Sequence, residues 1–127
     1  MNHLGGRYRR QEGFRLSFKQ PIPATFTIIK MQEKTLESNK GSFHIIDMSL
    51  KGAKVISNLE LPTPNTHIQM ECMILKENLN ITGELVWKKK TYEGFVYGVA
   101  FQFESYSERD LLRKLKKYVG KDIGMNE

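Results

Sequence analysis

The segment FVYGVAFQF at residues 95–103, with SERDLLRKLKKYVG at residues 107–120, decides the fold. Every second residue of the first part is aromatic or valine, and this period of two predicts a strand with one buried face. In the second part leucines recur at helical spacing behind Ser107, which can cap the amide of Asp110. The closing glycine suits a left-handed C-terminal cap. We therefore expect a strand followed by an amphipathic helix at about residues 107–119.

The same alternation recurs upstream, where we expect six further strands. They lie at residues 14–18, 24–31, 42–47, 53–57, 68–74 and 81–87. Polar or proline-marked turns join them, Pro21 and Pro23 interrupt the first two, and no segment between strands has the pattern of a crossover helix. Such an order predicts an antiparallel sheet that closes or nearly closes. The expected fold is all-β with one C-terminal helix: a small six- to seven-stranded antiparallel β-barrel, with the helix covering one end.

The pattern also predicts the core and the division of the chain. Five side chains are expected to be mostly buried: Leu85, Trp87, Val99, Phe101 and Leu111. Residues 1–13 are polar and contain several arginines and glycines, so we expect a flexible arm. The barrel and helix take residues 14–120, and residues 121–127 form a tail.

The composition excludes several classes of protein. The 127 residues make one domain, the longest apolar stretch is far too short to span a bilayer, and residues 1–10 lack the hydrophobic segment of a secretory signal. The single Cys72 cannot form an internal disulfide, so we expect a cytoplasmic location. A net charge of +6 only weakly indicates an anionic partner, because a solvated surface explains much of it equally well.

Residues that could carry catalysis or hold a metal are sparse. The three histidines, His3, His44 and His67, lack metal-ligand spacing. Cys72 lies on the apolar side of an expected strand and should pack as a small hydrophobic residue. We therefore expect no enzymatic activity, no metal and no cofactor.

Two short polar clusters stand out from this background. Their members are Arg9, Arg10 and Arg15 in the first, and Asp47, Ser49 and Gly52 of DMSLKG in the second. Alone, the first is explained by a solvated basic arm. Alone, the second is explained by a turn in which Asp and Ser hold backbone amides and Gly supplies a positive φ.

Together the clusters resemble the PilZ domain family, whose motifs are RxxxR near the N-terminus and [D/N]xSxxG after a strand. The second motif is matched without change. In addition, GELVWK at residues 83–88 and YGVAF at residues 97–101 are similar to the family's late hairpin, and a C-terminal helix follows. The resemblance covers roughly residues 8–120.

The first motif departs from the family pattern in its spacing. Four residues separate Arg10 from Arg15, and five separate Arg9 from Arg15, where the family has three. Gly13 could absorb one extra residue as a bulge. Either Arg9 or Arg10 is therefore a candidate for the first arginine.

The resemblance implies a receptor for the bacterial second messenger cyclic di-GMP, with the six cluster residues as ligand contacts and no catalysis. The chemistry suits this ligand, because guanidinium groups can bond O6 and N7 of guanine or pair with a phosphate. An aspartate can accept from the N1–H and N2 edge of guanine. The implied mechanism is a switch: residues 1–13 fold over the ligand against residues 47–52, and an unidentified downstream protein reads the changed surface.

Two alternatives stay open. A degenerate PilZ domain would bind only protein, which the altered arginine spacing allows. A barrel that binds RNA or single strands would share the basic charge and could stack bases on Tyr92, Phe95 and Tyr97. Alternation places Phe95 and Tyr97 on the core side, which counts against nucleic acid as a partner. Membrane insertion is not expected.

Overall fold

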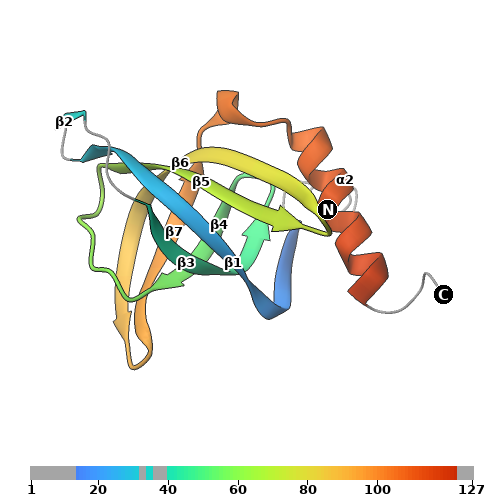
Figure 1. Ribbon diagram of the computed structural model, residues 1–127, viewed down its shortest axis with the longest axis horizontal. Helices are drawn as coiled ribbons and strands as arrows, with labels where there is room; N and C mark the ends of the chain where they lie inside the picture. Colours follow the sequence, from blue (N-terminus) through green and yellow to red (C-terminus); the bar gives the residue numbers. More distant parts are fainter. Residues whose placement is uncertain (1–13, 32–33, 36–39, 123–127) are drawn as a thin grey trace, which may run out of the picture.

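The computed structural model describes residues 14–31, 34–35 and 40–122 (Figure 1). In chain order its elements are β1 (Arg15–Met31), β2 (Lys34–Thr35), β3 (Gly41–Ser49), β4 (Gly52–Ser57), β5 (Thr66–Ile74), β6 (Glu77–Thr91), β7 (Gly94–Phe101), the 3-10 turn η1 (Phe103–Ser105) and the helix α2 (Glu108–Asp122). All strand pairings among the described residues are antiparallel.

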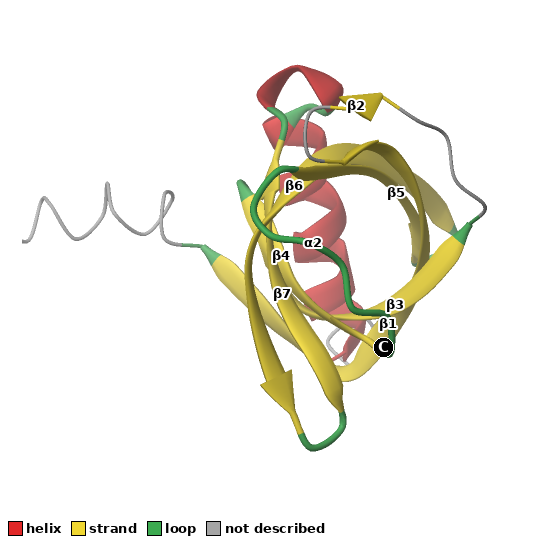
Figure 2. Cartoon of the chain, turned by 90° about the vertical axis from the view of Figure 1, so that its left-hand side faces the viewer, coloured by secondary structure: helices red, strands yellow, loops and turns green. Residues whose placement is uncertain are grey.

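The six long strands close into a ring. Their order is β1-β3-β4-β7-β6-β5, and β5 pairs in turn with β1, so the last strand returns to the first. The two-residue β2 pairs only with the last two residues of β1. Figure 2 looks into this ring and shows α2 across its far side. The predicted fold class, an antiparallel barrel with one C-terminal helix, is confirmed.

The core lies inside the ring, and alternate residues are buried along much of β5 and β6. In β5 every second residue from Thr66 to Ile74 is buried. Among the described residues Tyr97 of β7 is the largest side chain that is fully buried, and its hydroxyl has hydrogen-bond partners. Its hydroxyl donates to the Leu59 carbonyl at 2.6 Å and accepts from the Leu61 amide at 2.7 Å. The core therefore buries a phenol without leaving its oxygen unsatisfied.

The helix α2 covers one opening of the ring with an apolar stripe. Leu111 and Leu115, four residues apart on one face, are almost completely buried. As the sequence predicts, the Ser107 hydroxyl accepts from the Asp110 amide, at 3.1 Å. The predicted end of the helix is wrong: Gly120 continues the helix, which ends at Asp122.

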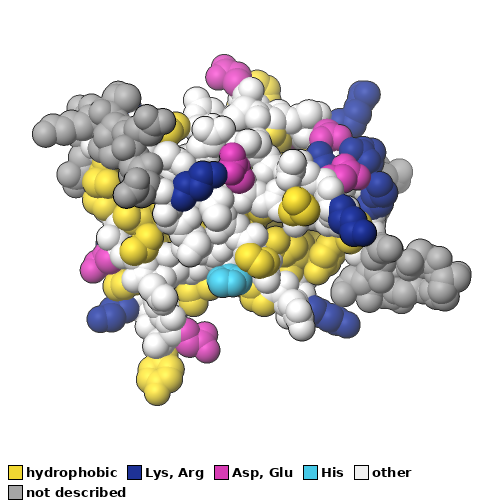
Figure 3. Space-filling model, in the orientation of Figure 1, with side chains coloured by type: hydrophobic (Ala, Val, Ile, Leu, Met, Phe, Trp, Pro, Cys, Tyr) yellow, Lys and Arg dark blue, Asp and Glu magenta, His cyan; other side chains and the backbone are white. Residues whose placement is uncertain are grey.

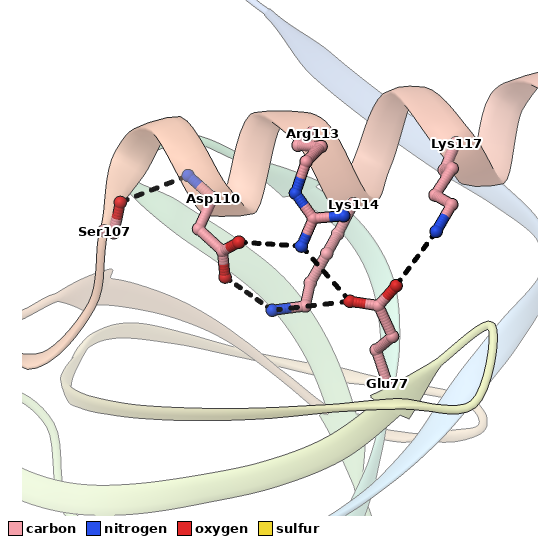
Figure 4. Close-up of polar contacts among 6 residues, drawn as sticks. All are labelled: Glu77, Ser107, Asp110, Arg113, Lys114 and Lys117. Atoms are coloured by element: carbon pink, nitrogen blue, oxygen red, sulfur yellow. Dashed lines mark hydrogen bonds and ion pairs between the residues drawn. The ribbon is translucent and has the colours of Figure 1, made fainter.

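Charged side chains tie α2 to the start of β6 (Figure 4). Glu77 lies 3.3 Å from Arg113, 3.9 Å from Lys114 and 3.1 Å from Lys117. Asp110 bridges Arg113 at 2.8 Å and Lys114 at 2.6 Å. In Figure 3 acidic and basic groups are interleaved over α2, on the right. This network links the helix to the start of β6.

The predicted break between the first two strands is wrong, because β1 runs unbroken through Pro21 and Pro23. Its register with β3 jumps from Ser17 opposite Asp47 to Ile22 opposite Ile45. Proline has no N–H for a ladder, and the jump leaves Pro21 outside this pairing. The prolines therefore mark an irregularity within one long strand.

The predicted core is confirmed at Leu85, Val99 and Leu111, whereas Phe101 is only half-buried and Trp87 is 45% exposed. The register explains Trp87. Leu85 pairs with Val99, and Trp87 pairs with Gly98, the residue before Val99. Two steps along β6 thus correspond to one step along β7, so Val86 is an extra residue in β6. A bulge of this kind turns the next side chain to the opposite face.

Candidate functional site

A row of paired residues crosses the outer face of the barrel. Ser17 of β1 lies opposite Asp47 of β3, and Asp47 lies opposite Lys54 of β4. Lys54 lies opposite Gly98 of β7, and Gly98 opposite Trp87 of β6. Directly paired residues project to the same side of a sheet. The row therefore gathers an acid, a cation and an aromatic side chain from five strands.

Asp47 reaches the outer face because β3 has a bulge. Ile45 pairs with Val55, and Asp47 pairs with Lys54. Two steps along β3 thus correspond to one step along β4, so Ile46 is the extra residue in β3. Although it points outward, the Asp47 side chain is only 8% exposed. The site therefore contains a carboxylate that is shielded from solvent by its neighbours.

Two cations lie beside this carboxylate. Nη1 of Arg15 donates to Oδ1 of Asp47, and Nζ of Lys54 lies 3.7 Å from Oδ2. Arg15 is half exposed at the start of β1, where Phe14 and Leu16 are partly buried and Phe18 is fully buried. The Arg15 side chain therefore points away from the core. The two cations thus compensate the shielding of this carboxylate from water.

The turn after Asp47 is closed by its own serine. The Ser49 hydroxyl accepts from the amides of Lys51 and Gly52, both at 3.1 Å, and lies 3.3 Å from the Gly52 carbonyl. Of the described glycines only Gly94 has a positive φ, so the predicted left-handed role of Gly52 is wrong. Instead, a Cβ at Gly52 would lie 2.4 Å from the Val99 carbonyl oxygen. Close approach of β7 is the reason for glycine here.

The same turn is connected to the start of α2. The Tyr106 hydroxyl donates to the Leu50 carbonyl at 2.6 Å, and Lys51 forms an ion pair with Glu108 at 2.9 Å. The Phe101 amide also donates to the Lys51 carbonyl, at 2.9 Å. The turn is thus held by the segment that leads into the helix.

A hollow of about 250 Å³ opens beside the row, and we call it the outer hollow. Its lining combines charged, aromatic and glycine residues: Arg15, Asp47, Gly52, Lys54, Trp87 and Gly98, with Ala53, Val86 and Val99. Sequence reasoning missed Lys54, Gly98 and Trp87 as site residues. The bulges that turn Asp47 and Trp87 to the same face leave no local signal in the sequence.

The structure brings together four of the six predicted site residues: Arg15, Asp47, Ser49 and Gly52. Arg9 and Arg10 lie outside the described residues. Burial raises the pKa of the Cys72 thiol to about 12, which suits its predicted role as a packed side chain. No group of three metal-ligating side chains occurs in residues 14–31 and 40–122. In the described part of the chain, no helix is long and apolar enough to cross a membrane.

The family model described as "PilZ domain" matches residues 8–121. The chain belongs to the PilZ domain family. Among solved structures it is similar to the PilZ domain of CeSA from a cellulose-synthesising bacterium, with a TM-score of 0.50 and 14% identity. That likeness covers 90% of this chain and 99% of the other, and at this identity it supports the fold alone. No curated protein matches the sequence. The family resemblance stated from the sequence is confirmed, and the family is in general one of cyclic di-GMP receptors.

Proposed function

We propose that this PilZ domain is a non-catalytic receptor for cyclic di-GMP. In this proposal the ligand lies against the outer hollow and contacts Arg9, Arg10, Arg15, Asp47, Ser49 and Gly52. The changed surface is then read by a downstream protein. No step of this mechanism needs a cofactor.

The pairing of Arg15 with Asp47 at the outer hollow is the observation that carries the proposal. The two residues lie 32 positions apart in the sequence, on different strands, yet their side chains form a hydrogen bond. Asp47 offers an acceptor for the N1–H and N2 edge of guanine, and Arg15 offers donors for a guanine or a phosphate. Lys54 adds a second positive charge within 3.7 Å of the carboxylate. Donors, an acceptor and positive charge therefore lie together at one hollow, which supports the proposal.

Residues 1–13 supply the remaining contacts in this proposal. We propose that they form an arm that closes over the ligand, with Arg9 and Arg10 reaching its bases and phosphates. Ordering such an arm costs conformational entropy, which charge-assisted hydrogen bonds must offset. Binding and the change of surface would then be a single event.

Calorimetric titration with cyclic di-GMP, with GTP and cyclic AMP as controls, tests this function directly. We expect binding of cyclic di-GMP alone among the three. The absence of binding at high micromolar cyclic di-GMP would overturn the receptor function and favour a degenerate PilZ domain that binds only protein.

An arginine series tests which residues of the first motif bind. We expect a large loss of affinity for Arg15→Ala and Arg10→Ala, about 1–3 kcal/mol for each good contact. Arg9→Ala should cost less and Arg7→Ala least, because exposed phosphate contacts are screened by salt. Deleting Gly13 restores the family spacing and should retain or improve binding. If Arg10→Ala binds like the wild type while Arg9→Ala does not, Arg9 is the first arginine.

Recognition of RNA or single strands has less support. Of the three aromatic residues that could stack bases, Tyr97 is fully buried and Phe95 is half-buried. Tyr92 is fully exposed at the turn between β6 and β7. Only one of these three rings is therefore exposed, and one ring is a poor platform for successive bases. Strong, salt-dependent binding of oligonucleotides would reverse this conclusion.

A further inference from the structure

The second half of β6 has no strand on its outer side. β5 accompanies β6 from Glu77 to Leu85, whereas β7 stays paired with β6 as far as Thr91. Figure 1 shows the hairpin of β6 and β7, in yellow and orange, projecting below the rest of the barrel. In the described part of the chain, no backbone hydrogen bond from a loop reaches residues 86–91. The closed ring therefore leaves one unpaired strand edge, the free edge of β6 (residues 86–91).

The free edge of β6 carries positive charge on both faces of the sheet. Its sequence, VWKKKT, contains three lysines and no acidic residue. Lys88 forms an ion pair with Glu60 at 3.2 Å. Lys89 and Lys90 are exposed, and neither has a carboxylate partner among the residues that the structure describes; Lys90 lies over the Phe95 ring, at 6.0 Å. Because neighbouring residues of a strand point to opposite faces, Lys89 and Lys90 place one cation on each face.

The charge of the free edge decides what can pair with it. Unpaired strand edges bind extended segments, because their N–H and C=O groups continue the ladder. A second copy of this chain would place lysines opposite lysines, and like charges directly opposite each other are destabilising. Residues 1–13 contain three arginines and one glutamate, so the edge repels them too. An acidic segment of another protein is the occupant with complementary charge.

We infer that the free edge of β6 binds an extended acidic segment of a partner protein as an added strand. Main-chain hydrogen bonds supply the affinity. Lys89 and Lys90 select a segment with acidic residues at two consecutive positions, one for each face of the sheet. The free edge contains none of the proposed contacts of cyclic di-GMP, so this inference does not rest on the proposed function.

Fluorescence anisotropy with a labelled peptide tests the inference. The probe has about eight residues, enough for one strand, with two central glutamates flanked by valine and threonine. Its matched control has two lysines in place of the glutamates. The wild-type protein should bind the acidic peptide at least about tenfold more tightly than the control, and added salt should weaken this binding. The absence of binding of the acidic peptide at millimolar protein would overturn the inference.

Hydrogen exchange distinguishes an added strand from simple attraction between charges. The bound acidic peptide should slow the exchange of alternate amides in residues 86–91, because every second N–H of an edge strand points outward. Saturating binding that leaves all of these amides unchanged would mean that no strand is added, and the inference would be wrong.

Substitutions provide a further measurement with the same probe. Lys89→Glu combined with Lys90→Glu should lose about tenfold or more in affinity for the acidic peptide. Lys19→Glu combined with Lys116→Glu is the matched control, because it changes the net charge equally at exposed lysines outside the free edge, and it should bind like the wild type. Circular dichroism establishes that each variant is folded. If the first variant fails to fold, Lys89→Gln combined with Lys90→Gln replaces it.

The results also separate this inference from the proposed function. Equal binding of the acidic peptide by the two folded variants would overturn the inference, and the lysines would then only keep the edge from pairing with other chains. A calorimetric titration without binding of cyclic di-GMP would overturn the receptor function alone, because the peptide measurements need no nucleotide.

Discussion

Two charged regions of this PilZ domain use similar residues in different ways. At the outer hollow, Asp47 is 8% exposed and lies next to Arg15 and Lys54, with space beside it. At α2, Glu77 is 32% exposed and Asp110 is 46% exposed, and their cations belong to the helix that they hold. The first region has a shielded acid beside an open hollow, whereas the second fastens a helix that already covers the core. Charge alone therefore does not distinguish the two regions, whereas the space beside the charge does.

The largest expected effect concerns the apolar contact under α2. Leu115→Ala removes a fully buried side chain between the helix and the barrel and should lower the free energy of unfolding by about 2–5 kcal/mol. Urea denaturation followed by circular dichroism measures this. Lys116→Ala, at an exposed position next to it, is the control and should change stability by less than about 0.5 kcal/mol. Equal stability of the two variants would mean that α2 does not contribute to the core.

The next effect concerns binding alone. Asp47→Ala should weaken cyclic di-GMP binding by about 1–3 kcal/mol while leaving the fold intact. The stability cost is small because Arg15 and Lys54 are both exposed enough to be solvated when Asp47 is absent. Calorimetry and thermal unfolding of the same sample measure both quantities. Unchanged affinity with a lower melting temperature would mean that Asp47, like Glu77 and Asp110, only stabilises the fold.

Ser49→Ala should have an effect of intermediate size, on both stability and binding, because the Ser49 hydroxyl also closes the turn. Losing the acceptor for the Lys51 and Gly52 amides should cost about 1 kcal/mol of stability, and binding should weaken as well. Ser49→Thr keeps a hydroxyl and should restore most of both. A stability loss with wild-type affinity would make the turn purely structural.

The smallest effect is the pH dependence of the α2 network. Hydrogen bonds from Lys117 and Lys114 lower the pKa values of Glu77 and Asp110 below their usual 4.5 and 3.8. A carboxyl group whose pKa is lower in the folded state than in the unfolded state stabilises the fold at pH values above its unfolded pKa. This stabilisation is lost as the pH falls through the folded pKa. Thermal unfolding between pH 7 and pH 3 should therefore show a small loss of stability below about pH 4.5. Glu77→Gln should make this pH-dependent loss of stability smaller, and added salt should also make it smaller.

Much of the fold could be predicted from the sequence, because alternation reports directly which residues face a core. The strands, the antiparallel order, the N-cap at Ser107 and the burial of Leu85 and Val99 follow from local patterns. The exposure of Trp87 could not be predicted from local patterns. Its exposure depends on the extra residue Val86, and a bulge is set by the strand that pairs with it. Local periodicity therefore predicts a buried tryptophan where the register exposes one.

The candidate site was predictable only in part for the same reason. D-x-S-x-x-G identified the turn, and the family resemblance linked it to the arginines. The contact between Arg15 and Asp47 comes from the register of β1 with β3, and the placement of Asp47 on the outer face comes from the bulge at Ile46. The contributions of Lys54 and Gly98 arise from pairings between strands that lie far apart in sequence. Such pairings have no local signature.

The contact between Tyr106 and the Leu50 carbonyl has a consequence for local unfolding. The turn that carries Ser49 is held through Tyr106, Glu108 and Phe101, which lead into α2. Detaching the segment from Tyr106 to Glu108 therefore removes two of the supports of this turn, and we expect the turn and the start of α2 to open as one cooperative unit. Amide hydrogen exchange should give the Gly52 and Leu111 amides similar opening free energies, although they lie on different elements and 59 positions apart in the sequence (111 − 52).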